Sequence, residues 1–82
     1  MRQFRLKRQL EVRNSHRCVR FLFDEMFKQR MTQADLADRT GIANDTLKHW
    51  RLYTMPRISD LEAALNTLGY ELTVRKVKDA RD

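Results

Sequence analysis

The chain contains only two glycines and one proline, and these residues stand between stretches that have the periodicity of amphipathic helices. Within each stretch, apolar side chains recur at every third or fourth position, which places them on one helical face. Gly41 and Gly69 can end helices with positive φ angles, and the segment around Pro56 is predicted to be a loop. The pattern predicts an all-α domain with four helices, over residues 15–29, 32–40, 44–51 and 59–68.

Polar residues at the expected helix starts supply candidate N-caps. Thr32 can cap the second helix, with Asp35 placed favourably near its positive end. The other candidates are Asn14 or Ser15 for the first helix, Asn44 or Asp45 for the third, and Ser59 with Glu62 as a capping box for the fourth.

The composition excludes several classes of protein. An 82-residue chain of this kind is enough for one small domain, and its lone cysteine, Cys18, cannot form an intrachain disulfide. No cysteine or histidine pair has metal-ligand spacing, and no motif of an enzyme active site is present, so we expect no metal, no cofactor and no catalysis. No apolar run approaches the roughly 20 residues of a membrane span. We therefore expect a cytoplasmic protein.

Positive charge is concentrated in the first quarter of the chain. Residues 1–20 hold seven basic residues and one acidic residue, whereas the remaining residues are balanced, so the net charge of +6 arises from this quarter alone. Such a segment favours a polyanionic partner, because each neutralised phosphate releases condensed counterions. A basic segment that is simply solvated is the alternative. We define residues 1–13 as a basic N-terminal arm, in which Arg5 and Arg8 are candidate DNA contacts.

Both ends of the chain contain segments whose structure is less clearly predicted. Residues 70–77 alternate in polarity and are rich in β-branched residues, which predicts a strand. A lone strand needs a partner, and the candidates are the N-terminal segment or the same strand of a second subunit. Residues 4–11 are compatible with a strand but favour helix by propensity, which makes a dimerisation role for residues 70–77 the better prediction. Residues 78–82 are predicted to be a disordered tail.

The third predicted helix separates apolar from polar side chains. Leu47 and Trp50 lie three residues apart on one face, where they can seat the helix on the core together with Leu36. Ala37 is small enough for two short helices to cross closely, and Gly41 allows a tight turn between them. The outward face then carries polar residues that can read base edges: Asn44, Asp45, Lys48 and His49.

The segment Thr32-Gln-Ala-Asp-Leu-Ala-Asp-Arg-Thr-Gly-Ile closely resembles the opening of the Cro/cI-like, or Xre-type, helix-turn-helix family. The resemblance continues through Trp50 and through Leu61-Glu-Ala-Ala-Leu-Asn-Thr-Leu-Gly, and covers residues 18–69. It implies a lambda-repressor-like helical domain with its recognition helix in the major groove. Within that domain, over residues 14–69, the implied DNA contacts are a phosphate clamp by Gln33, base contacts by Asn44, Asp45, Lys48 and His49, and backbone contacts by Thr46 and Arg51.

The resemblance and the charge distribution together predict a sequence-specific regulator of transcription, a repressor of bacterial or phage type, that binds double-stranded DNA as a homodimer. The ending Gly-Tyr-Glu-Leu-Thr-Val is more weakly similar to the C-terminal strand of HipB-type antitoxins. That similarity supports an alternative, in which the protein binds a toxin as well as its own operator. A module that binds only proteins through the same fold is a further alternative.

Overall fold

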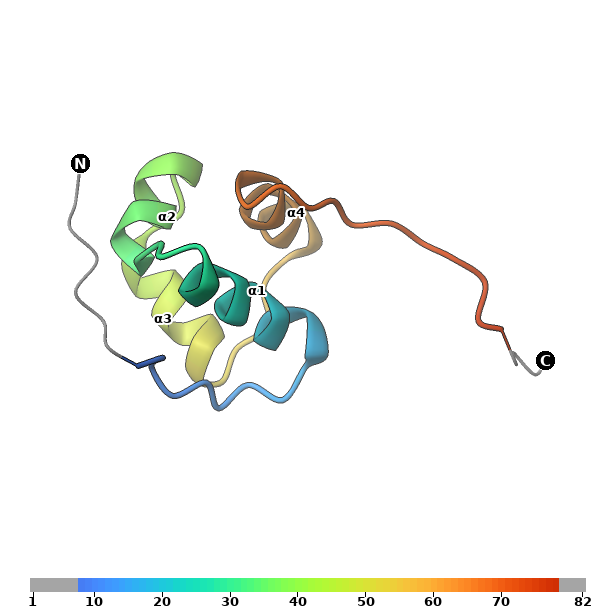
Figure 1. Ribbon diagram of the computed structural model, residues 1–82, viewed down its shortest axis with the longest axis horizontal. Helices are drawn as coiled ribbons and strands as arrows, with labels where there is room; N and C mark the ends of the chain where they lie inside the picture. The colour runs from blue at the N-terminus through green and yellow to red at the C-terminus, as the bar shows by residue number, and fades with distance from the viewer. Residues whose placement is uncertain (1–7, 79–82) are drawn as a thin grey trace.

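The structure, a computed structural model, describes residues 8–78, which contain four helices and no strand (Figure 1). They are α1 (Arg17–Lys28), α2 (Gln33–Thr40), α3 (Asn44–Leu52) and α4 (Ile58–Thr67). The expectation of an all-α domain is therefore confirmed for the described residues. None of these helices is long and apolar enough to cross a lipid bilayer.

The four helices share one apolar core. Helices α1 and α2 each contact both α3 and α4, so every helix contributes to the same buried cluster. Leu22, Leu36 and Leu47 are fully buried, and Trp50 is almost so. The predicted apolar stripes account for most of the core, which consists of Val19, Leu22, Phe23, Met26, Met31, Leu36, Leu47, Trp50, Leu61, Ala64, Leu65 and Leu68.

The start and end of α2 follow the sequence prediction closely. The Thr32 hydroxyl accepts a hydrogen bond from the Asp35 amide at 3.0 Å, and the Asp35 carboxylate accepts one from the Thr32 amide at 3.1 Å. This reciprocal pair satisfies two amides that the helix itself cannot. At the other end, Gly41 has a φ of 78°, in the left-handed region that glycine adopts without steric cost. The chain thus leaves α2 sharply and enters α3 within three residues.

The N-caps of the other three helices differ from the prediction. Helix α1 begins at Arg17, after His16, whose Nδ1 accepts a hydrogen bond from the Cys18 amide. Ala43 precedes α3 and makes no side-chain cap, so neither Asn44 nor Asp45 has that role. Helix α4 begins at Ile58, one residue earlier than predicted, and its N-cap is Arg57. The predicted capping box of Ser59 and Glu62 does not form. Asp60 then occupies the first turn, where it stabilises the positive helix end.

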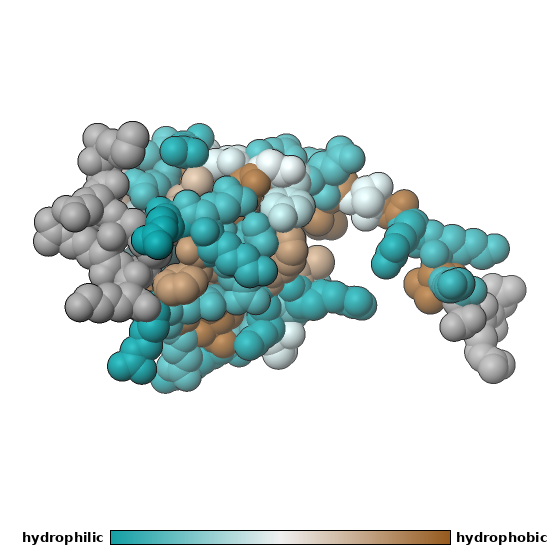
Figure 2. All heavy atoms as spheres, in the orientation of Figure 1, coloured by the Kyte–Doolittle hydropathy of each residue, from teal (hydrophilic) through white to brown (hydrophobic). Residues whose placement is uncertain are grey.

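The segment after α4 runs away from the helical body (Figure 1). Tyr70 anchors its start through an edge-to-face contact with Phe21, with ring centroids 4.9 Å apart. Partial burial and a hydrogen bond with Glu25 raise the pKa of the Tyr70 phenol. Farther along, Val74 is 96% exposed, and hydrophobic side chains on this segment stand clear of the body in Figure 2. The predicted strand over residues 70–77 is not formed in the single chain, because no second strand lies beside it among residues 8–78.

The segment before α1 is irregular. Residues 9–16 form no helix, so the preference for helix over residues 4–11 is wrong for the described part of that stretch. Residues 4–7 lie outside the described residues, as do Arg5 and most of the tail predicted for residues 78–82. Hydrogen bonds to the end of α3 replace the regular helical ones in this segment, as described below.

Replacing Thr32 by Ala removes one half of the capping pair at the start of α2. We expect the free energy of unfolding to fall by about 1 to 2 kcal/mol, because an amide of the first turn loses its partner. Urea unfolding followed by circular dichroism measures the change. Thr73→Ala, at an exposed position after α4, is the matched control and should leave the midpoint unchanged. Equal midpoints for the two variants would contradict a stabilising cap at Thr32.

Candidate nucleic-acid interface

Helices α2 and α3 are packed together through a short turn, and α3 presents a polar face to solvent. Leu47 and Trp50 turn inward to the core, which fixes the rotation of α3 about its axis. The opposite side of the helix is therefore left for another surface. Of the residues predicted there, Asn44, Asp45, Thr46 and Lys48 are exposed, and His49 is partly exposed.

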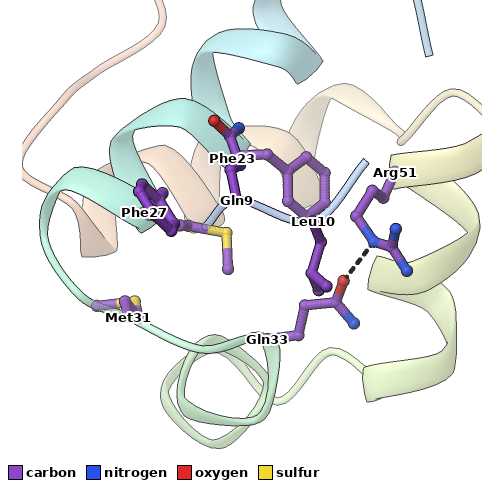
Figure 3. Close-up of a pocket in the computed structure, with 8 residues that line it drawn as sticks. Gln9, Leu10, Phe23, Phe27, Met31, Gln33 and Arg51 are labelled. Carbon is purple, nitrogen blue, oxygen red and sulfur yellow. Dashed lines mark hydrogen bonds between the residues drawn. The ribbon is translucent and has the colours of Figure 1, made fainter. Parts of the chain in front are cut away.

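Gln33 joins the start of α2 to both ends of α3. Its side-chain nitrogen donates to the Asn44 side-chain oxygen at 3.1 Å, and its side-chain oxygen accepts from Nε of Arg51 at 2.8 Å. The second of these contacts is drawn in Figure 3. The structure thus connects three of the predicted site residues through side chains. Gln33 is oriented from one side by Arg51 and orients Asn44 on the other.

Arg51 also contacts the segment that precedes α1. Its Nη1 donates to the carbonyl of Glu11 at 2.7 Å, while its own carbonyl accepts from the amides of Arg13 and Asn14 at 2.8 and 3.1 Å. We call residues 9–14 the strap, because they lie along the C-terminal end of α3. A backbone contact with DNA is predicted for Arg51 from the sequence. In the structure this side chain is half-buried, and its guanidinium is engaged inside the protein.

Asn14 fastens the strap and was predicted only as a helix cap. Its side chain is buried, and Nδ2 donates to the carbonyls of Trp50 and Thr54 at 3.0 and 2.9 Å. Its Oδ1 accepts from the amide of His16 at 2.9 Å. These bonds satisfy carbonyls at the end of α3 that have no helical partner. An asparagine before a helix is the only sequence signal, and it does not reveal contacts 36 and 40 residues away.

A small hollow lies between the strap, α1 and the pair of Gln33 and Arg51 (Figure 3). Phe23 and Met31 contribute apolar walls, and Leu10 of the strap lies at its edge. The space measures about 30 Å³, far below the roughly 300 to 1,000 Å³ of a small-molecule pocket. It is therefore a packing gap under the strap and is too small for a cofactor or substrate.

A stacked aromatic pair ends the polar face of α3. The rings of His49 and Tyr53 have centroids 5.5 Å apart and are inclined by 27°. Tyr53 is 68% exposed, so the pair presents a flat edge to solvent. Sequence reasoning selected His49 but missed Tyr53, although their spacing of four residues places them on one side of a helix. The pair restricts the imidazole to one side of the α3 terminus.

The charges near α3 are of both signs. Asp45 lies in the first turn of a helix that has no side-chain cap, where its negative charge stabilises the positive helix end. Lys48 is one turn farther along and exposed. On the strap, Arg13 lies 3.3 Å from the carboxylate of Glu11, but both are well exposed and contribute about 0 to 1 kcal/mol. Arg8 is exposed at the start of the described residues.

No group of three or more histidine, cysteine, aspartate or glutamate side chains within residues 8–78 is placed to hold a metal ion. Comparison with protein-family models, with curated proteins and with solved structures finds no significant match.

Replacing Asn14 by Ala removes the side chain that holds the strap to the end of α3. We expect the free energy of unfolding to fall by about 2 kcal/mol, because buried carbonyls of Trp50 and Thr54 lose a donor. Chemical denaturation at neutral pH measures this loss. The neighbouring exposed Ser15→Ala is the control, expected within about 0.5 kcal/mol of the parent. A loss of similar size in both variants would show that Asn14 has no special role.

Proposed function

We propose that the protein is a sequence-specific double-stranded DNA-binding regulator of transcription, a repressor of bacterial or phage type. The observation that carries the proposal is the orientation of α3: its apolar side is held in the core and its other side presents polar groups to solvent. An α-helix with side chains is about 10 to 12 Å wide, which suits the major groove at about 12 Å. Helix α2 then lies beside the groove with Gln33 at its start.

The exposed groups of α3 have donors and acceptors that suit base edges. Asn44 can pair with adenine through two hydrogen bonds, Lys48 can donate to guanine, and Asp45 can accept from the amino group of cytosine. Gln33 lies at a helix N-terminus, where amides and the helix dipole favour a phosphate. These assignments agree with the resemblance described above, and the hydrogen bond from Gln33 to Asn44 supports them independently.

Affinity is supplied mainly from outside α3 in this proposal. Asp45 opposes Lys48, so the reading face is close to neutral and attracts DNA weakly. The strap leads back from α1 along the end of α3. Arg5 and Arg8 of the basic arm precede the strap in the sequence. Contacts of arginine with phosphates add affinity that depends on salt rather than on sequence.

A homodimer is the second part of the proposal. Residues 70–77 retain a strand pattern with no partner among residues 8–78, and Val74 and Val77 are largely exposed. An antiparallel pair centred on Thr73 places Glu71 opposite Arg75 of a second copy and Leu72 opposite its Val74. Two pairs of opposite charges and two apolar pairs would thus meet in one register. A two-fold dimer presents two recognition helices to half-sites about 34 Å apart.

Selection of duplexes from a random pool tests DNA binding directly. We expect an enriched palindrome, and we expect Lys48→Ala to lose about 1 to 3 kcal/mol of discrimination at one base position. Arg5→Ala or Arg8→Ala should instead weaken binding to all duplexes alike and lower the salt dependence by about one phosphate contact. Binding titrations at several salt concentrations separate the two effects. Failure to enrich any sequence would refute the proposal.

Replacing Val74 by Asp tests the dimer. The change puts a charge where two strands would bury an apolar pair, and we expect the dissociation constant of the dimer to rise at least about tenfold. Sedimentation equilibrium measures it. Ser59→Asp adds the same charge at an exposed position of α4 and serves as the control. A dimer that tolerates Val74→Asp would have a different interface.

The alternative of an antitoxin rests on apolar side chains outside the proposed DNA face. Met55 and Ile58, beside the loop from α3 to α4, are 53% and 77% exposed. Such side chains can contribute to a protein interface. Co-purification with a protein encoded beside this chain, lost on Ile58→Asp with DNA binding retained, would establish that second function.

A further inference from the structure

We propose that Arg51 is a positioning residue that sets base recognition by Asn44 through Gln33, while it holds the strap in place, and that it is not itself a DNA contact. This inference rests on the DNA-binding function proposed above. It departs from the role that the sequence suggests for Arg51. A direct phosphate contact needs guanidinium nitrogens that are available to DNA, whereas here the side chain is half-buried and Nε and Nη1 already donate to acceptors within the protein.

The geometry of the guanidinium explains why arginine is needed. One edge nitrogen, Nε, donates to Gln33, and another, Nη1, donates to the carbonyl of Glu11. The two acceptors belong to segments far apart in sequence, α2 and the strap. A planar fork can hold both at once, whereas the single ammonium of a lysine cannot reproduce two fixed directions. Gln33 is thereby held with its oxygen toward Arg51 and its nitrogen toward Asn44.

The orientation of Asn44 follows from this chain of bonds. The oxygen of Asn44 accepts from Gln33 through one of its two lone pairs, which fixes the amide while leaving its nitrogen and the second lone pair for the two hydrogen bonds to adenine. An asparagine whose amide can rotate freely must lose that freedom when it binds a base, which lowers its discrimination. By orienting Gln33, Arg51 thus reduces the entropy that the Asn44 side chain would otherwise lose when it binds a base.

The fold does not depend on the same contacts. Leu47 and Trp50 seat α3 in the core, and the backbone carbonyl of Arg51 accepts from Arg13 and Asn14 whatever the side chain is. The side chain of Asn14 holds the strap to Trp50 and Thr54 independently. Arg51→Lys, which keeps the charge and the aliphatic stem, should therefore fold and retain the strap.

The test compares Arg51→Lys with Arg39→Lys, which makes the same chemical change at an exposed position in the last turn of α2. Asn44→Ala first identifies the base pair whose identity no longer affects binding. Affinity is then measured for the selected duplex and for a duplex changed at that base pair, and the ratio of the two affinities is the discrimination at that position. We expect Arg51→Lys to reduce that ratio of affinities about five- to tenfold with an unchanged salt slope, and Arg39→Lys to leave the ratio intact. In an Asn44→Ala background, Arg51→Lys should have no further effect on the ratio. A uniform loss over all duplexes, or a similar ratio for both lysine variants, would overturn the proposal.

A measurement without DNA tests the first link separately. The Nε proton of Arg51, which is donated to Gln33, should exchange slowly with solvent in NMR spectra and should exchange faster in Gln33→Ala. Rapid exchange in the parent protein would refute the positioning role even if DNA binding is confirmed. If exchange is slow but no duplex is selected, the function fails and the positioning role fails with it. The two failures are therefore distinguishable.

Discussion

The burial of Leu36, Leu47 and Trp50 in one core is the constraint on which the rest of the structure depends. Leu47 and Trp50 lie three residues apart, so their joint burial fixes which side of α3 faces the solvent. Leu36 fixes α2 against the same core, and Gly41 permits the short connection between the two helices. The positions of Gln33, Asn44 and Lys48 follow from these apolar contacts. The polar face of α3 is thus a consequence of packing.

The features that could be predicted from sequence are those that depend on neighbours within one helical turn. The apolar stripes, the capping pair of Thr32 and Asp35, and the positive φ of Gly41 are all of this kind. The long-range contacts of Asn14 and Arg51 could not be predicted, because their partners lie 18 to 40 residues away. The sequence also suggested side-chain caps for α3 and α4, but both helices begin without one.

The segment from Tyr70 to Val77 has the sequence pattern of a strand but forms none in the single chain. Its alternation and β-branched residues describe a surface suited to pleated pairing, but the hydrogen bonds of a strand must come from a neighbour. Tyr70 and Leu72 contact the helical body, whereas Val74 does not. Pairing between two copies would therefore account both for the strand-like alternation of residues 70–77 and for the lack of a strand there in the single chain. Sequence alone cannot distinguish a partner within the chain from one outside it.

The near-neutral charge of the exposed α3 face is explained by Asp45. Asp45 stabilises the uncapped start of α3, so its charge serves the helix even though it opposes a polyanion. In the proposed complex the repulsion between Asp45 and DNA must be offset elsewhere, and the positive excess of the chain lies in its first quarter. The amides of Arg13 and Asn14 bond to the last turn of α3, so the strap is held against the helix that carries the proposed reading face. Under the proposed function, attraction and recognition are separate in sequence, and Arg51 contacts both the strap and Gln33.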